Sequence, residues 1–173
     1  MHTKASGNLG EQIAAEYLED QGCRVLERNA VYCGAETDII LEAYCDERGN
    51  ILKGAFAKPS FLGRIFGRPR KNTAYSDTAA AKEKSDKEVI IKNGVRYEKT
   101  IIFCEVKTRY GKEYGDAAET ITAQKIARCV KSAKGYLVRH GLEGHRVSFH
   151  VVCVTPQGIE HIKDAFGEDD VRF

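Results

Sequence analysis

The stretch TIIFCEVKTR, from Thr100 to Arg109, is the feature that most constrains the fold of this chain. Its nearly continuous apolar run predicts a central strand that is covered on both faces. Glu105 and Lys107 interrupt the run, and side chains two apart on a strand project from the same face of the sheet. Burying an unpaired charge is costly, so this pair needs partners. For an isolated ExK on a strand, a salt bridge between the two is the ordinary interpretation, and only further acidic residues change it.

Hydrophobic periodicity predicts helices and strands on both sides of this stretch. The expected helices are 8–21, about 122–140 and a short terminal one at 159–166, and the expected strands are 23–32, 36–45, 89–98 as a hairpin around Asn93-Gly94, 100–109 and 147–154. A chain of 173 residues, 42% of them hydrophobic, suits one domain with a single core. We therefore predict an α/β fold over residues 1–173, with a mixed central β-sheet flanked by helices.

Residues 46–87 differ in composition from the rest, and we interpret them as an insertion in this domain. Seven basic residues and no acidic one lie between Arg48 and Ser76, and three phenylalanines are interleaved with them. Such a segment suits a nucleic-acid backbone with exposed bases. It equally suits a membrane surface or a partner protein, because apolar residues between Phe61 and Phe66 recur at helical spacing.

Two further carboxylates stand in unusual places. Asp38 precedes an apolar run in the strand 36–45, on the face that Glu36 and Ile40 share, and the alternative is a solvated edge or a turn cap. Glu11 falls inside the apolar arc of the first helix, where a simple preference for negative charge near a helix start is the alternative. Both carboxylates are therefore candidate partners of Glu105.

Three inward-facing carboxylates and a lysine two residues after one of them predict a site for a hard divalent cation. Mg²⁺ prefers oxygen ligands, typically a few carboxylates with waters and substrate phosphates, and Mn²⁺ is expected to substitute for it. Such an ion activates a water and offsets the charge on a phosphodiester in the transition state. A nearby lysine can orient the water or stabilise the phosphate.

Asp38 followed by Glu105-x-Lys107 on another core strand resembles the PD-(D/E)XK signature of restriction-endonuclease-like nucleases. More closely, the chain resembles the YraN-like family of predicted endonucleases. The similarity is carried by Gly7-x-x-Gly10-Glu11-x-x-Ala14-x-x-Tyr17-Leu18, Gly22, Arg28-Asn29, Glu36-x-Asp38-Ile39-Ile40, Phe103-x-Glu105-Val106-Lys107-Thr108-Arg109, Tyr114-Gly115, Lys125, Tyr136-Leu137 and Ile159-Glu160-His161-Ile162. It implies a restriction-endonuclease-like core, α-β-β-β-α-β, with the insertion between the second and third core strands.

The same resemblance implies a metal-dependent phosphodiesterase site at Glu11, Asp38, Glu105 and Lys107. Three departures are visible, and the first two leave these ligands intact. Ala35 stands where the family has a glycine, His150 stands where an acidic residue is expected, and the insertion is unusual.

A basic row on the helix 122–140 predicts a surface for nucleic acid. Lys125, Arg128, Lys131 and Lys134 recur at intervals of three, which suits a phosphate-gripping face or, as readily, a solvated helix surface. Gln124 is expected to touch the scissile phosphate, as the comparable position does in related nucleases. The expected nucleic-acid-binding residues are Gln124, Lys125, Arg109 and Arg128.

The sequence thus predicts a magnesium-dependent endonuclease that hydrolyses phosphodiester bonds, with DNA as the expected substrate. The alternatives are a non-catalytic nucleic-acid-binding module on the same fold and a protein-interaction factor whose insertion is the working surface. With 27 basic and 25 acidic residues, affinity for nucleic acid must come from local patches. No small-molecule cofactor is expected.

Cysteine usage and hydropathy indicate the compartment. The six cysteines lie far apart and include no CxxC pair, which favours buried cytosolic thiols over zinc knuckles or disulfides. No apolar run has the length of a signal peptide or of a membrane span. We therefore expect a soluble, cytoplasmic protein.

Overall fold

The structure is a computed structural model that describes residues 4–56, 89–109 and 121–167. Its elements are α1 (Lys4–Gln21), β1 (Arg24–Tyr32), β2 (Ala35–Cys45), β3 (Val89–Lys92), β4 (Val95–Thr108), α3 (Ala123–His140), β5 (Arg146–Thr155) and β6 (Gly158–Ile162). Most of the predicted insertion, 57–87, lies outside the described residues. Neither helix of the described ranges is long and apolar enough to cross a bilayer.

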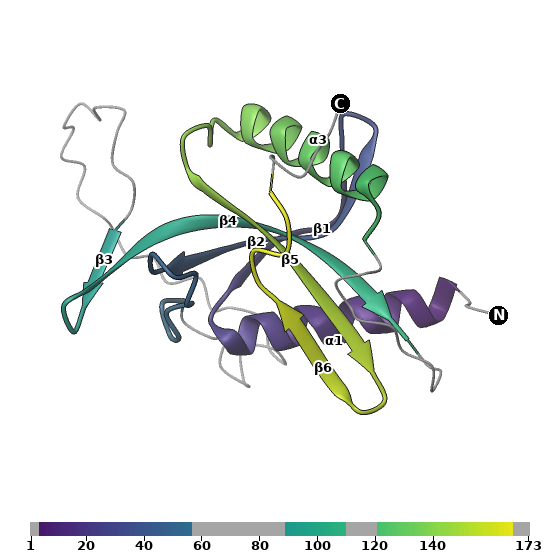
Figure 1. The fold of residues 1–173 in the computed structure, drawn as a ribbon, viewed down its shortest axis with the longest axis horizontal. Helices are drawn as coiled ribbons and strands as arrows, with labels where there is room; N and C mark the ends of the chain where they lie inside the picture. Colours follow the sequence, from purple (N-terminus) through teal and green to yellow (C-terminus); the bar gives the residue numbers. More distant parts are fainter. Residues whose placement is uncertain (1–3, 57–88, 110–120, 168–173) are drawn as a thin grey trace, which may run out of the picture.

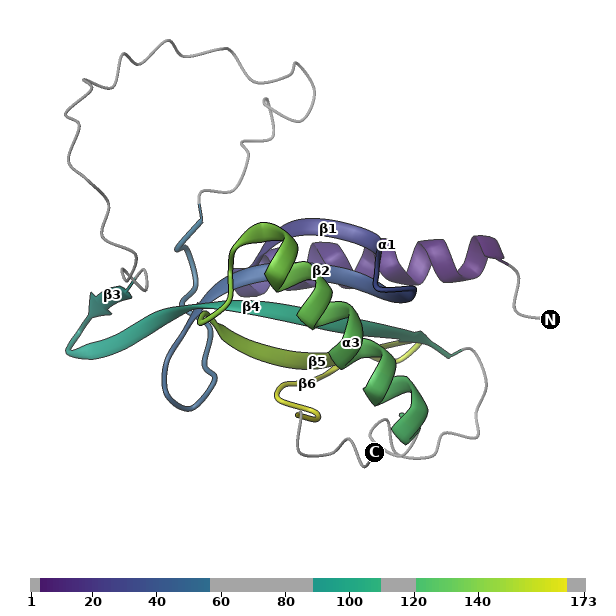
Figure 2. The ribbon, with the colours of Figure 1, turned by 90° about the horizontal axis from the view of Figure 1, so that it is seen from above.

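The described strands form one mixed sheet between the two helices (Figures 1 and 2). The order is β1-β2-β4-β5-β6, with β3 paired to β4; β4 and β5 are parallel, and the other pairs are antiparallel. Helix α3 lies over one face of the sheet and α1 over the other (Figure 1). This mixed α/β fold, with a central sheet flanked by helices, confirms the predicted class.

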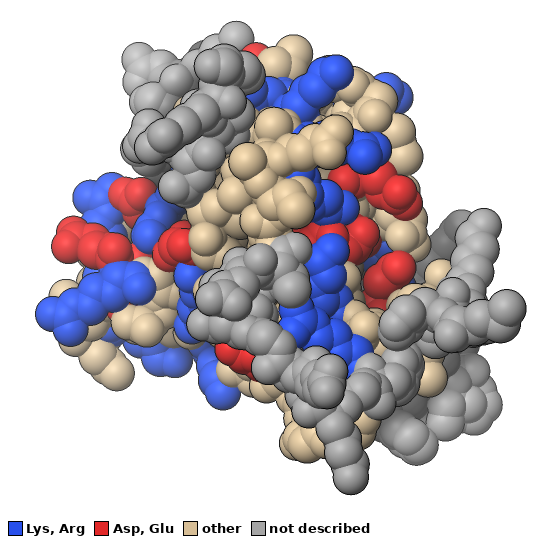
Figure 3. Space-filling model, turned by 45° about the vertical axis from the view of Figure 1, so that its right-hand side comes forward, with Lys and Arg blue, Asp and Glu red and all other residues tan. Residues whose placement is uncertain are grey.

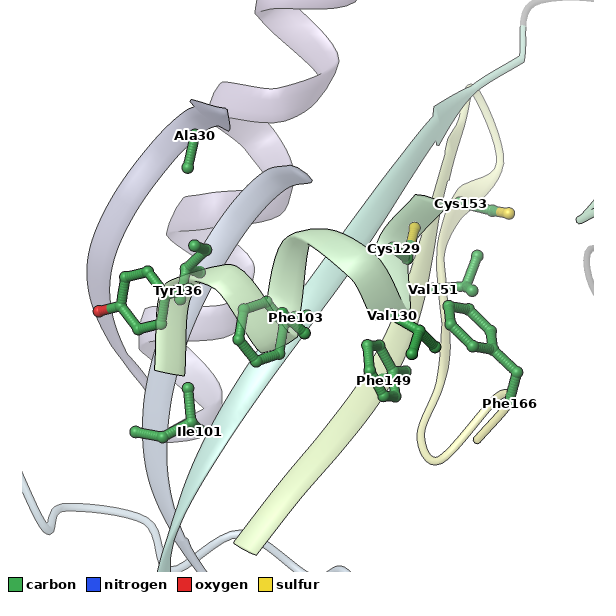
Figure 4. Packing of buried hydrophobic residues seen from close by; sticks show 12 residues of the cluster. Ala30, Ile101, Phe103, Cys129, Val130, Tyr136, Phe149, Val151, Cys153 and Phe166 are labelled. Atoms are coloured by element: carbon green, nitrogen blue, oxygen red, sulfur yellow. The ribbon is translucent and has the colours of Figure 1, made fainter. Parts of the chain in front are cut away.

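Alternate residues of β4 enter two different core layers. Phe103 packs with Tyr136 of α3 and Phe149 of β5 on one face (Figure 4). Cys104 belongs to the other layer, with Leu18 of α1. Because both faces of β4 are covered, TIIFCEVKTR is the buried central strand that its apolar run predicted.

Local signals in the sequence account for the ends of several elements. The side chain of Thr122 accepts a hydrogen bond from the backbone N–H of Lys125 and caps α3, and Gly141 ends this helix at φ 63°. The Asn93-Gly94 turn between β3 and β4 has φ values of 51° and 75°, the left-handed pair that a two-residue hairpin turn requires. These predicted boundaries are confirmed.

The predicted terminal helix, 159–166, is wrong: its first half is strand β6. Ile159 and Ile162 are three residues apart, which fits one face of a helix. In β6 the same two residues point to opposite faces, so that Ile159 packs in the α1 layer and Ile162 in the α3 layer. Apolar residues three apart therefore fit either one face of a surface helix or the two opposite faces of a strand that lies between two core layers.

Two histidines pair where β5 and β6 lie side by side. His150 on β5 and His161 on β6 share a hydrogen bond of 2.9 Å between Nδ1 and Nε2, and Tyr17 of α1 packs edge-on against His161. Burial lowers the pKa of His150 to about 3 and that of His161 to about 4. His150, which stands where an acidic residue was expected, is therefore a neutral partner of His161.

Helix α1 lies close to the end of β4 at Gly10, which packs against the side chain of Thr108. A methyl group at Gly10 would overlap the hydroxyl of Thr108, the last residue of β4, whereas a methyl at Gly7 would meet nothing within 4 Å. Thr108 follows Lys107, and Gly10 precedes Glu11. The close contact therefore sets Glu11 beside the end of β4.

We predict that Gly10→Ala destabilises the protein by about 1–3 kcal/mol, because the added methyl forces α1 away from β4. Gly7→Ala is the matched control, and it should be neutral or stabilising by about 0.5–1 kcal/mol, because alanine favours the helix. Urea unfolding of both variants measures the difference. Equal stabilities would show that the contact between α1 and β4 is not tight.

We predict that the histidine pair makes the fold sensitive to mild acid. Both pKa values are lowered in the folded protein, so unfolding takes up protons below pH 6.5, and the stabilisation is lost as the pH falls toward the folded values. Between pH 7 and pH 5 the loss should be about 3–4 kcal/mol larger in the native protein than in the His150→Gln, His161→Gln variant, with about 2 kcal/mol from the buried His150 and somewhat less from the partly exposed His161. Urea unfolding at both pH values tests this, with His145→Gln as control. Parallel pH dependence in native protein and double variant would contradict it.

Candidate active site

The sheet register brings Asp38 and Glu105 together near the end of β4. Ile39 of β2 pairs with Cys104 of β4, so Asp38 lies opposite Glu105 at the next position. The backbone N–H of Val106 donates to Oδ2 of Asp38 at 2.7 Å and holds the carboxylate against the strand. Two carboxylates that are 67 residues apart in sequence thus meet at one point of the sheet.

The expected alternation of side chains along β2 breaks at Asp38. Regular alternation would place Thr37 and Ile39 on one face, but the hydroxyl of Thr37 donates to Ser132 of α3 at 2.8 Å, whereas Ile39 packs in the α1 layer. Asn29 lies opposite Asp38 in the β1–β2 register and has a left-handed φ of 49°, which interrupts the regular ladder. Asp38 therefore lies where β2 changes face, at the boundary between the two layers.

Glu105 is a buried carboxylate held by two lysines. Its side chain is 4% exposed, and Lys107 donates to its Oε1 at 2.8 Å. The Nζ of Lys125, in the first turn of α3, lies 2.7 Å from its Oε2. The salt bridge between Glu105 and Lys107 that the ExK pattern suggested is present, and a second cation joins it.

Lys125 is the residue whose place the sequence reasoning missed. It was expected on a nucleic-acid-binding surface, yet its ammonium lies in the carboxylate cluster, and its interaction with Glu105 raises its own pKa against the opposing effect of burial. The cap at Thr122 marks where α3 begins, but no local pattern gives the position of its first turn relative to β4.

Burial and neighbouring charge perturb Asp38. Burial, the negative charge of Glu105 and, to a smaller extent, that of Glu11 together raise the pKa of this carboxyl group to about 7. The Val106 amide and the charge of Lys125 act in the opposite direction. Near neutral pH, Asp38 therefore lies close to the balance between its two protonation states, and added positive charge favours the ionised form.

Glu11 stands beside this pair on α1. Its side chain is 16% exposed, and its Oε2 is buried, with no hydrogen-bond partner among the described residues. The Nη2 atom of Arg28 lies 3.9 Å from that oxygen. A buried carboxylate oxygen without a hydrogen-bond donor is costly, so this oxygen suits a cationic or hydrogen-bonding ligand.

These donors fit a hard divalent cation in part. Mg²⁺ is commonly bound by one or two carboxylates together with waters and phosphate oxygens, which Asp38 and Glu105 can supply as a pair. Within 4–56, 89–109 and 121–167, no three Asp, Glu, His or Cys side chains form a group that could hold a metal ion. Glu11 thus does not complete a three-carboxylate cluster with the pair in this structure.

The remaining predicted residues are Arg109, Gln124 and Arg128. Arg109 follows β4, where its backbone N–H donates to Val154 of β5. Gln124 and Arg128 lie on the exposed side of α3. Figure 3 looks onto the end of the molecule where β4 finishes, and shows basic side chains running down this face with acidic ones beside them.

Comparison with known proteins finds one family. The model of "Uncharacterised protein family UPF0102" matches residues 10–53 and 70–154, which include Glu11, Asp38, Glu105, Lys107 and Lys125. The break between the matched ranges lies within the predicted insertion.

Several relatives match along nearly the whole chain. A UPF0102 protein of Persephonella marina is 26% identical over 169 residues, 98% of this chain and 99% of the relative, and one of Pelotomaculum thermopropionicum is 27% identical over 169 residues, 94% and 96%. A UPF0102 protein of Frankia casuarinae is 36% identical over 84 residues, 46% of this chain and 68% of the relative. With a family model that matches most of its length, the chain belongs to the uncharacterised protein family UPF0102, as its resemblance to YraN-like proteins predicted.

Proposed function

We propose that this protein is a metal-dependent endonuclease that hydrolyses phosphodiester bonds in nucleic acid, with DNA as the expected substrate. The observation that carries the proposal is the buried Glu105, opposite Asp38 and in contact with Lys107 and Lys125. Stability alone is a weak reason to bury such a group, because a buried ion pair rarely outperforms apolar packing. Perturbed carboxylates with adjacent lysines are a common feature of catalytic sites.

Each residue of the cluster has a role in this proposal. Asp38 and Glu105 would hold Mg²⁺ or Mn²⁺, and Glu11 would bind a water at the edge of the site. When bound, such an ion supplies the positive charge that activates water and offsets charge on the phosphate. Lys107 would position the attacking water or the phosphate, and Lys125 would contact the phosphate once it is no longer needed to neutralise Glu105.

The element order supports a restriction-endonuclease-like core as part of the same proposal. Without the short β3, the chain runs α1-β1-β2-β4-α3-β5, which is the α-β-β-β-α-β order that the sequence resemblance implied. The segment between β2 and β4 contains the predicted insertion, so the additional residues leave the two site-bearing strands adjacent.

One observation favours the alternative of a non-catalytic nucleic-acid-binding module. Lys107 and Lys125 together occupy both oxygens of Glu105, so the buried carboxylate is neutralised without any bound cation. The raised pKa of Asp38 and the unpartnered oxygen of Glu11 weigh against this alternative, because neither is satisfied by the lysines.

We predict that the protein cuts DNA with Mg²⁺ or Mn²⁺ and not with EDTA, when offered single-stranded, duplex and branched substrates. Asp38→Asn, Glu105→Gln and Lys107→Ala should each lower the cleavage rate by about 100-fold or more, because the first two remove a proposed metal ligand and the third removes the cation that positions the water or the phosphate. Glu36→Gln on β2 and Lys92→Ala on β3, both exposed, are the matched controls and should cut normally. Binding to every substrate without cutting any of them would favour the non-catalytic module.

We predict that divalent cation binding is tighter at pH 8 than at pH 6, by up to about tenfold. The pKa of Asp38 is raised to about 7, so at pH 6 the cation must displace a proton that is already absent at pH 8. Calorimetric titration with Mn²⁺, in buffers of different ionisation enthalpy, measures both the affinity and the released proton. Asp38→Asn should bind weakly at both pH values. Equal affinity of the native protein at pH 6 and pH 8 would argue against a role for Asp38 as ligand.

A further inference from the structure

A cavity of about 820 Å³ runs along the exposed side of α3, next to the candidate active site. Its lining begins at Gln124, the neighbour of Lys125, and continues to Arg139 near the end of the helix. At 1.5 Å per residue, this stretch of helix is roughly 20 Å long. We call this cavity the α3 groove; it extends away from the point where Lys125 meets Glu105.

The charge of the α3 groove has one sign. Arg128, Lys131, Lys134 and Arg139 line it, and no acidic residue is among the described residues of its lining. Three of these four recur at intervals of three along one side of the helix. Such a row offers successive contacts to a chain of phosphates, whose binding depends on clustered basic side chains rather than on net charge.

The floor of the α3 groove is apolar. Ala127, Val130 and Val138 contribute small or branched side chains between the basic residues. The surface of a duplex presents phosphates outward and could only lie across such a cavity. An unpaired strand can place its sugars and base faces against the floor while the basic side chains contact its backbone.

Cys33 of the β1–β2 turn completes the described lining of the α3 groove, and a glycine of α3 lets this turn lie close to the helix. A methyl group at Gly135 would lie 2.6 Å from the Sγ of Cys33 and 3.2 Å from the Cβ of Tyr32. Cys33 is exposed and lines the groove, whereas the other five cysteines of the chain are buried. The structure thus provides one accessible thiol, and it lies inside the groove.

We propose that the α3 groove binds a single-stranded segment of nucleic acid leading away from the cleavage site. The proposal rests on the proposed function, and it narrows the substrate class to nucleic acid with an unpaired strand, such as a branched or flapped structure. Basic residues contact the backbone, and the apolar floor receives the unpaired nucleotides. Cys33 has no chemical role and serves as a reporter of occupancy.

Alkylation of Cys33 tests this in EDTA, where no cutting occurs. A twelve-nucleotide oligothymidylate should slow the reaction of Cys33 with N-ethylmaleimide at least fivefold, followed by mass spectrometry of the full-length protein. The variant Lys131→Glu, Lys134→Glu should lose most of this protection. Lys92→Glu, Arg96→Glu, the same charge change on the β3–β4 hairpin, is the matched control and should retain it.

Several outcomes would overturn the proposal. If a duplex or poly-aspartate protects Cys33 as well as the oligonucleotide does, the groove has a different ligand. If thymidine monophosphate protects Cys33 equally at the same concentration, the groove binds a single nucleotide and not an extended strand. Unchanged protection in the Lys131→Glu, Lys134→Glu variant would remove the groove from binding. Protection in EDTA without any metal-dependent cutting would instead refute the nuclease and leave the groove intact, so the two failures are distinguishable.

Discussion

The rest of the candidate site depends on the ion pairs that the buried carboxylate of Glu105 forms with two lysines. Lys107 of the same strand and Lys125 of α3 both contact it, so a single charge links the central strand to the helix that covers one face of the sheet. Removing either lysine would leave a buried charge less than fully compensated, which is costly. The geometry of the candidate site therefore depends on the position of α3, because Lys125 of this helix contacts Glu105.

The second constraint on the candidate site is the position of Asp38 at the boundary between the α1 layer and the α3 layer of the core. Glycine at position 10 brings α1 onto the end of β4, and the irregularity at Asn29 lets β2 change face at Asp38. As a result, this carboxylate is influenced by Glu105 from one layer and by Glu11 from the other, and its pKa is raised by burial and by both charges. A compact fold leaves few other points where groups from both faces of a sheet can act together.

Much of this was predictable from sequence, and the failures have physical causes. The apolar run with two charges identified β4, and hydrophobic periodicity identified α3, because both signals are local. The prediction of a terminal helix was wrong, because Ile159 and Ile162 lie in a strand and enter different core layers. The contact of Lys125 with Glu105 was not predicted, because it depends on how far α3 reaches over the sheet, and no local pattern records that distance.

The central claim is that Asp38 and Glu105 form a cation site that the lysines leave available. Anomalous diffraction from crystals of the full chain grown with Mn²⁺ tests it most directly. We expect one strong anomalous peak in contact with a carboxylate oxygen of each residue. A well-ordered structure in which Lys107 and Lys125 still hold both oxygens of Glu105, with no peak beside Asp38, would contradict it.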